Sequence, residues 1–155
     1  MNLLSGQYKP PVNRPVPPHR IAVVGVGSGG CKIIDYLTAS CLEGPAVAGI
    51  NTDAGVLAVC RANTKLAIGA ARTQGFGTGG DAVIGRQAAE DDLDMIRTLF
   101  EGVELAFVIV GLGGGTGTGA APVVLRAARE AGAATLCFAT LPFVFEGAQR
   151  RERAE

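Results

Sequence analysis

Residues 105–119 read LAFVIVGLGGGTGTG, in which an unbroken apolar run passes directly into a loop that is mostly glycine. An apolar run of this length, rich in branched side chains, is typical of a central parallel strand that is buried on both faces. A helix is expected next, over residues 119–131, with Pro122 in its first turn and Gly132 at its C-terminal end. The stretch therefore predicts a strand, a glycine loop and a helix in succession.

The same unit recurs along the chain. A long helix is expected after Asp81, a residue suited to an N-cap, because an apolar stripe at helical spacing follows it. The stripe consists of Ala89, Leu93, Ile96 and Phe100. The other expected strands cover residues 21–24, 46–50, 65–68 and 134–139, and the other expected helices cover 31–40 and 54–61. Alternating strands and helices predict an α/β fold, a parallel sheet with helices on both faces.

Length and charge exclude several classes of protein. The 155 residues suffice for one domain, and 14 basic side chains balance 14 acidic ones. A net charge of zero does not favour binding to nucleic acid or to an anionic membrane surface. No apolar stretch approaches the ~18–20 residues that a membrane span requires, and the N-terminus lacks the apolar segment of a secretory signal. We therefore expect a soluble, cytoplasmic protein with no nucleic-acid partner and no direct membrane insertion.

Two further features are read from composition. Residues 1–19 contain five of the eight prolines and few apolar residues, which favours a disordered leader. The cysteines follow neither a C-x-x-C pattern nor a metal-binding spacing, so we expect buried free thiols and no metal site. They are Cys31, Cys41, Cys60 and Cys137.

Glycine makes up 23 of the 155 residues, and 14 of these lie in three clusters, at 25–30, 75–80 and 111–119. In a parallel sheet each cluster would lie at the carboxyl edge, where ligands of such folds bind. Backbone N–H groups of glycine loops and helix N-termini suit phosphate oxygens, and Thr116 and Thr118 add hydroxyls. Glycines that only make tight turns are the alternative, but three clusters at one edge favour a phosphate-bearing ligand.

Local sequence patterns are compatible with more than one type of nucleotide. Residues 25–30, GVGSGG, fit the dinucleotide fingerprint G-x-G-x-x-G, and Asp53 follows Gly30 by 23 residues, so NAD is one candidate. That interpretation leaves residues 111–119 unexplained. A P-loop is excluded, because the loop has no G-K-[ST] and no lysine follows Lys65. The phosphates are therefore expected to be held by backbone N–H groups and hydroxyls.

The sequence GGGTGTG at 113–119 resembles the signature loop of the tubulin/FtsZ GTPase superfamily. Residues 25–30 are similar to the first phosphate loop of the family, and residues 51–54, NTDA, to its second. Residues 75–80 and 84–89, GFGTGG and IGRQAA, resemble the loop that senses the γ-phosphate and the helix after it. Residues 142–147, PFVFEG, with Arg150, resemble the segment that contacts the ribose. The resemblance covers residues 20–155 and is greater to bacterial FtsZ than to eukaryotic tubulin, which implies a partial, Rossmann-like GTP-binding domain.

The resemblance implies GTP or GDP as the bound nucleotide, with Mg²⁺ bound through its phosphates. Four groups of residues would form the site: the α/β-phosphate side, the diphosphate loop, the γ-phosphate loop and the ribose contacts. The residues so implied are Gly27, Ser28, Gly29, Gly30, Lys32, Asn51, Asp53, Thr78, Gly79, Gly80, Gly113, Gly114, Gly115, Thr116, Gly117, Thr118, Gly119, Glu146 and Arg150.

Three features depart from the family pattern. Lys32 stands where an asparagine that approaches the base is typical, and Asp81 stands where asparagine is usual, although Asp81 is also well placed to cap a helix. The acidic catalytic loop of the family, similar to N-x-D-F-A-D, does not occur in these residues, and residues 90–94 (EDDLD) are most simply a solvated helix face. We therefore expect a fragment or a truncated relative that has no catalytic residues of its own and is inactive alone as a GTPase.

Two functions remain from the resemblance. The first is the nucleotide-binding part of a cytoskeletal GTPase that polymerises for bacterial cell division, with guanine nucleotide, itself or FtsZ subunits, and division-site adaptor proteins as partners. The second is a non-catalytic module that binds nucleotide or FtsZ subunits and modulates their assembly. A dinucleotide-dependent oxidoreductase is the third and weakest candidate.

Overall fold

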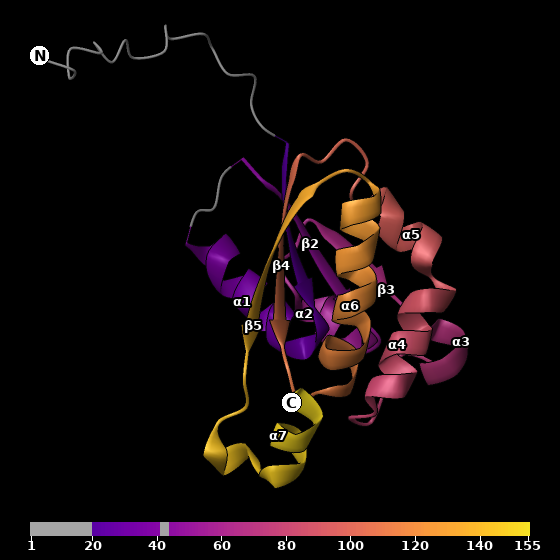
Figure 1. The fold of residues 1–155 in the computed structure, drawn as a ribbon, viewed down its shortest axis with the longest axis vertical. Helices are drawn as coiled ribbons and strands as arrows, with labels where there is room; N and C mark the ends of the chain where they lie inside the picture. The colour runs from indigo at the N-terminus through magenta and orange to yellow at the C-terminus, as the bar shows by residue number, and fades with distance from the viewer. Residues whose placement is uncertain (1–19, 41–43) are drawn as a thin grey trace, which may run out of the picture.

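A computed structural model describes residues 20–40 and 44–155, so the expected leader at 1–19 and Cys41 lie outside the described residues. Within them the chain forms a five-stranded sheet whose neighbouring strands are all parallel (Figure 1). The strand order is β3-β2-β1-β4-β5. The strands are β1 (Ile21–Val26), β2 (Ala46–Asn51), β3 (Thr64–Ala67), β4 (Leu105–Gly111) and β5 (Ala134–Thr140).

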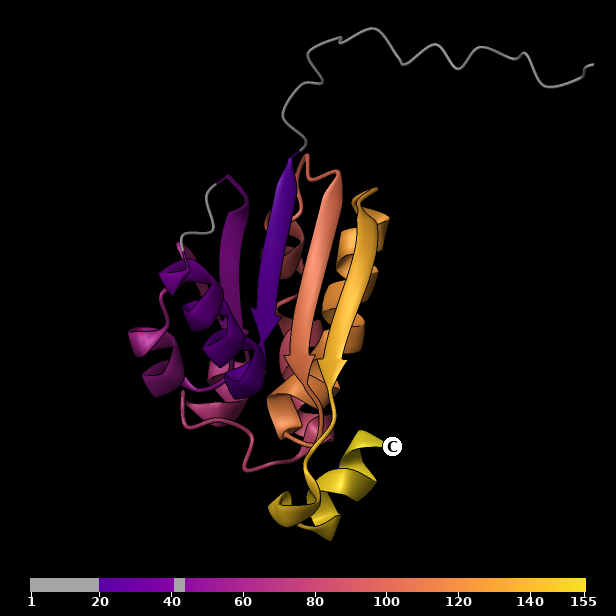
Figure 2. The ribbon, with the colours of Figure 1, turned by 90° about the vertical axis from the view of Figure 1, so that its left-hand side faces the viewer.

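Helices cover both faces of this sheet, as the alternating pattern predicts (Figures 1 and 2). One face packs against α1 (Gly27–Ala39) and α2 (Ala54–Val59). The other packs against α6 (Gly115–Glu130), which α4 (Ala82–Asp91) and α5 (Leu93–Thr98) flank. The remaining elements are α3 (Ala70–Thr73), the 3-10 helix η1 (Val144–Glu146) and α7 (Ala148–Ala154).

The central strands bury side chains on both faces. Val24 in β1 and Val108 in β4 belong to the core beneath α6, whereas Val23 and Ile109 belong to the core beneath α1. Because successive strand residues point to opposite faces, an uninterrupted apolar sequence is what two covered faces require. The parallel sheet inferred from residues 105–110 is therefore confirmed.

The order of the strands brings the loops that follow β1 and β4 to one edge of the sheet. The chain runs from β1 outward to β2 and β3, and then returns to the other side of β1 with β4. β1 and β4 pair in register from Ile21 with Leu105 to Val26 with Val110, so they end at the same edge. Their carboxyl ends form the switch point at which open α/β sheets bind ligands.

Two helices begin four residues earlier than expected. α1 begins at Gly27 rather than residue 31, and α6 begins at Gly115 rather than residue 119, which puts Pro122 in the interior of α6. The first turns of both helices are rich in glycine and pack closely against backbone of other elements. A Cβ on Gly30 would overlap the Ile109 carbonyl oxygen, and a Cβ on Gly119 would overlap that of Ala82. Gly132, with φ of +88°, follows the end of α6 as predicted.

The prediction of a single long helix after Asp81 is wrong, because the chain forms two helices, α4 and α5, with a break at Asp92. Asp92 has φ of −106° and ψ of 24°, and its carboxylate accepts the Gly69 N–H at 2.6 Å. The apolar stripe survives the break, since Ala89, Ile96 and Phe100 are all fully buried.

The prediction of buried thiols holds for two cysteines and is wrong for a third. Cys31 and Cys60 are buried together under α1, and burial raises the pKa of the Cys31 thiol to about 12. Cys137 is exposed on β5. Among the described helices, none has the length and apolar character needed to cross a membrane.

Helices leave part of β5 uncovered on the α1 side of the sheet (Figure 2). Leu136 and Phe138 lie on this side and are 49% and 56% exposed. Phe138 stacks on Phe107 of β4, with ring centroids 6.1 Å apart. We call Phe107, Leu136 and Phe138 the β5 face.

Candidate functional site

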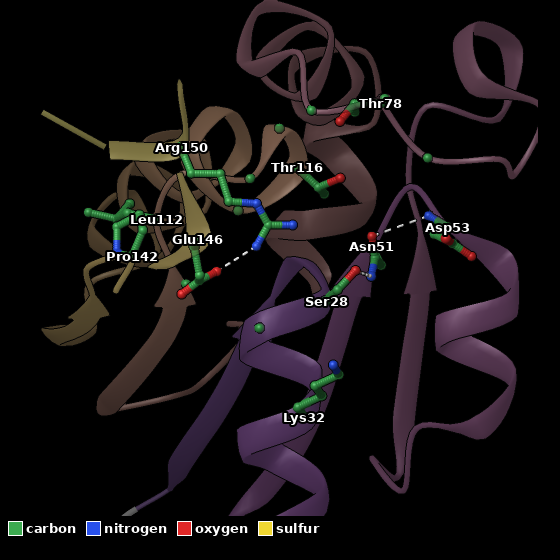
Figure 3. A pocket seen from close by; sticks show the side chains of 18 of the residues that line it. Ser28, Lys32, Asn51, Asp53, Thr78, Leu112, Thr116, Pro142, Glu146 and Arg150 are labelled. Atoms are coloured by element: carbon green, nitrogen blue, oxygen red, sulfur yellow. Dashed lines mark hydrogen bonds and ion pairs between the residues drawn. The ribbon is translucent and has the colours of Figure 1, made fainter. Parts of the chain in front are cut away.

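A cleft of about 470 Å³ opens at the carboxyl edge of the sheet, where β1 and β4 end side by side (Figure 3). Five segments form its wall: the start of α1, the end of β2, the loop before α4, the start of α6 and the segment after β5. Most of the residues predicted from the sequence line it. These are Ser28, Gly29, Lys32, Asn51, Asp53, Thr78, Gly79, Gly80, Gly114, Gly115, Thr116, Gly117, Glu146 and Arg150.

Five predicted residues, Gly27, Gly30, Gly113, Thr118 and Gly119, lie behind the wall instead. Gly27 has φ of +71°, and a Cβ there would lie 2.7 Å from the Gly117 nitrogen, so it lets the starts of α1 and α6 approach each other. The Thr118 hydroxyl accepts the Gly113 N–H at 2.9 Å. These residues shape the cleft, and the described structure places none of them on its lining.

Two long helices begin at the cleft. Neither α1 nor α6 has a side chain that hydrogen-bonds its first N–H groups. The first four N–H groups of a helix have no partner within it, and the helix dipole adds about half a positive charge there. The geometry therefore provides two adjacent anion-binding helix ends at the switch point of the sheet.

The end of β2 contributes a buried polar group. The Asn51 side chain is 1% exposed, donates to the Ser28 hydroxyl at 3.3 Å and accepts the Asp53 N–H at 3.2 Å. The Asp53 carboxylate accepts the Val56 N–H at 3.0 Å and thereby caps α2. Asn51 thus fixes the orientation of two residues on the lining, and the Asp53 carboxylate is already engaged in a helix cap.

The loop before α4 is held to its neighbours by backbone and hydroxyl groups. The Gly77 N–H donates to the Thr52 carbonyl at 3.3 Å, and the Thr52 hydroxyl lies 2.7 Å from that of Thr116 in α6. The Asp81 carboxylate accepts the Val83 N–H at 2.7 Å, which confirms its helix-capping role at α4. Asp81 does not line the cleft.

Glu146 and Arg150 form an ion pair in the segment after β5, which completes the wall of the cleft. Arg150 donates to Glu146 at 2.6 Å, and its guanidinium points into the cleft (Figure 3). The second carboxylate oxygen of Glu146 accepts the Phe143 N–H at 3.0 Å. That backbone hydrogen bond and the Arg150 contact lower the pKa of Glu146, so the side chain is ionised at neutral pH.

Other lining residues were not singled out from the sequence as binding residues. Most of them lie inside the quoted motifs without having been predicted to bind, whereas Thr140 and Leu141 lie outside every quoted motif and resemble ordinary strand and loop residues. The additional lining residues are Phe76, Gly77, Gly111, Leu112, Thr140, Leu141 and Pro142.

Several solved structures have a similar fold. An FtsZ dimer from M. jannaschii superposes with a TM-score of 0.85 at 41% identity, over 88% of this chain and 40% of that one. CetZ2 from Haloferax volcanii, in a GTPγS-bound protofilament, superposes with a TM-score of 0.78 at 27% identity, over 87% of this chain and 43% of that one.

Sequence comparison also finds FtsZ proteins. The chain is 48% identical to cell division protein FtsZ 1 of Archaeoglobus fulgidus over 135 residues, which is 87% of this chain and 37% of that protein. It is 44% identical to cell division protein FtsZ 2 of Rhizobium meliloti over 149 residues, 96% of this chain and 43% of that protein. The chain therefore spans about two fifths of the relatives that it matches.

The family model described as the GTPase domain of the tubulin/FtsZ family matches residues 20–155. This match replaces the oxidoreductase alternative that was based on residues 25–30 and Asp53. It accounts for all three glycine clusters, which one cleft brings together. The chain belongs to the tubulin/FtsZ family.

Proposed function

We propose that this chain is the guanine-nucleotide-binding part of an FtsZ-like cytoskeletal GTPase that polymerises in the cytoplasm during bacterial cell division. One observation supports this most directly: two uncapped helix ends and the glycine-rich loops meet in one cleft of about 470 Å³. A volume of this size lies within the range of small-molecule sites, and its donors suit phosphates.

The nucleotide would extend along the cleft, with each of its parts near a different group of lining residues. The diphosphate would contact residues 114–117 and the start of α1, and a terminal phosphate would approach Thr78 and Gly79. The ribose hydroxyls would donate to the ionised Glu146, and the base would lie toward Lys32.

Magnesium would reach this site with the nucleotide. No group of three or more histidine, cysteine or acidic side chains gathers into a metal site among the described residues. Mg²⁺ commonly keeps several waters and binds through substrate phosphates with few protein ligands. The hydroxyls of Thr78 and Thr116 on the lining are compatible with such a phosphate-bound, hydrated ion.

Residues 1–155 would bind the nucleotide without hydrolysing it. Hydrolysis of the γ-phosphate requires a group that positions or activates water. The two carboxylates on the described lining are already engaged, Asp53 in the cap of α2 and Glu146 with Arg150 and the Phe143 N–H. The same observation favours a second candidate function, a non-catalytic module that binds nucleotide or FtsZ subunits and modulates their assembly. Adding the purified chain to polymerising FtsZ separates the two, since only a modulator changes the extent of assembly.

A competition experiment tests the nucleotide assignment. A fluorescent GDP analogue bound to the purified chain is displaced with GTP, GDP, ATP and NAD in parallel. We expect weak binding, displacement by GTP and GDP, and little displacement by ATP or NAD. Arg150→Gln should weaken both guanine nucleotides, whereas Arg151→Gln should not, because Arg151 pairs with Glu155 instead. Tight NAD binding with no response to guanine nucleotides would refute the proposal.

A further inference from the structure

Arg153 extends from α7 onto the loop that precedes α4. A Cβ built on Gly80 would lie 2.6 Å from Nη1 of Arg153 and 3.5 Å from its Cζ. The guanidinium therefore occupies the space where a side chain at residue 80 would stand. Gly80 lines the cleft, so Arg153 lies against a residue of the cleft wall.

The charges around the cleft make Arg153 distinctive. The lining carries two cations, Lys32 and Arg150, and two carboxylates, Asp53 and Glu146, so its formal charges cancel. Arg150 pairs with Glu146, and on the same helix Arg151 pairs with Glu155. Within residues 20–40 and 44–155 no ion pair is formed by Arg153, which leaves an unneutralised cation against Gly80.

We infer that Arg153 is a specificity-determining residue that binds the terminal phosphate of a nucleoside triphosphate. The inference rests on the proposed function, which places the ribose beside Glu146 and the diphosphate along residues 114–117. A third phosphate would then extend toward Gly79 and Gly80, where it adds negative charge in a cleft whose lining is neutral. A guanidinium presents a planar set of donors that matches phosphate oxygens, and this one is already held against the loop.

The consequence is discrimination between triphosphate and diphosphate. GDP would end before the part of the loop that Arg153 touches, whereas GTP would reach it. Arg150, which points into the cleft next to Glu146, would contribute equally to both nucleotides. The two arginines lie three residues apart on one face of α7 but act on different parts of the ligand.

The test measures Kd for GDP and for a non-hydrolysable GTP analogue, with Mg²⁺, using residues 1–155 and three variants. Arg153→Gln should raise the Kd of the GTP analogue about tenfold, the loss of one charge-assisted contact, and change that of GDP less than about twofold. Arg153→Lys should fall between Gln and wild type, and the control Arg151→Gln should change neither. Thermal unfolding of each variant verifies that α7 substitutions leave the fold intact.

Equal losses for both nucleotides in Arg153→Gln, or no loss for either, would overturn the inference while leaving the proposed function standing. A wild-type chain that binds neither nucleotide would overturn both.

Discussion

Neighbouring glycines in the cleft wall have different physical roles. Gly115 faces other backbone, since a Cβ there would overlap the Thr78 hydroxyl and lie 2.7 Å from both the nitrogen and the carbonyl oxygen of Asp81. Gly114 faces the open cleft, where a Cβ would meet nothing within 4 Å, and its φ of −89° suits any residue. One glycine allows two elements to pack, and the other leaves room for a ligand.

Alanine substitutions at these two positions should therefore separate folding from binding. Gly115→Ala should reduce the free energy of unfolding by about 1–3 kcal/mol, the usual cost of overpacking. Gly114→Ala should change it by less than about 0.5 kcal/mol, yet weaken nucleotide binding because its methyl group enters the cleft. Urea denaturation and nucleotide titration of both variants test this, and equal destabilisation by the two would contradict it.

The sequence shows where glycines cluster, but not which of them border the ligand. Gly113 and Gly114 are adjacent and chemically identical, yet a Cβ on Gly113 would lie 2.6 Å from the Arg150 carbonyl oxygen, which comes from α7. Such approaches depend on how distant elements pack, and a local pattern does not contain that information. Fourteen of the residues predicted from the motifs line the cleft, whereas Gly27, Gly30, Gly113, Thr118 and Gly119 do not; contact of any of them with a ligand stays a prediction.

At the scale of elements, strands were easier to predict than helix ends. The apolar runs of β1, β2 and β4 identify strands because both sheet faces are buried, whereas glycine-rich first turns in α1 and α6 resemble loops. Asp92 shows the other limitation: the helix breaks at this residue, whose carboxylate accepts the Gly69 N–H, although the apolar stripe continues across the break. The stripe indicates which helix face points toward the core, and the buried residues of both α4 and α5 lie on that face.

Asp81 provides a direct test of helix capping. Its carboxylate accepts the N–H groups of Val83 and Ile84 at 2.7 and 3.3 Å. Asp81→Ala should lower the free energy of unfolding by about 1 kcal/mol, because those N–H groups lose their partner. Asp81→Asn keeps an acceptor in place and should be nearly neutral. Chemical denaturation of the two variants provides the comparison, and an equal loss from Asn would indicate that charge, rather than the cap, is what matters.

The segment containing η1 and α7 should respond to acid through Glu146. Its pKa is lowered in the folded chain by the Phe143 N–H and then by Arg150, so the stabilisation is present above the ordinary glutamate pKa of 4.5. It is lost as the pH falls through the lower, folded value. Hydrogen exchange at the Phe143 amide should therefore be slow at pH 6 and accelerate, relative to the intrinsic rate, as Glu146 becomes protonated. Glu146→Gln should exchange faster at pH 6 and show no such transition; an unchanged transition would assign it to another group.

At the scale of the whole molecule, the β5 face is an exposed apolar surface at one edge of the sheet. Leu136 and Phe138 expose about half of their surface on a strand that also forms the edge of the sheet. Exposed apolar side chains beside unpaired strand edges promote association between chains. The relatives that the chain matches are more than twice as long.

We expect residues 1–155 to self-associate through this face. Replacing Leu136 and Phe138 together by lysine should shift sedimentation toward the monomer and raise the concentration at which the chain precipitates. Val59→Lys is the matched control, since Val59 is 77% exposed but lies on α2, away from β5. A wild-type chain that sediments as a single monomer at high concentration would contradict the expectation.

The parallel sheet also determines where the molecule can be attached to something else. All five strands run toward the cleft, so Arg20 and the start of β1 lie at the far end of the sheet from it (Figures 1 and 2). α7, at the other end of the described chain, is itself part of the cleft wall through Arg150. A fluorophore or surface tether on the amino-terminal side would leave the cleft open to solution, whereas a carboxyl-terminal label would be placed beside the residues whose binding it is meant to report.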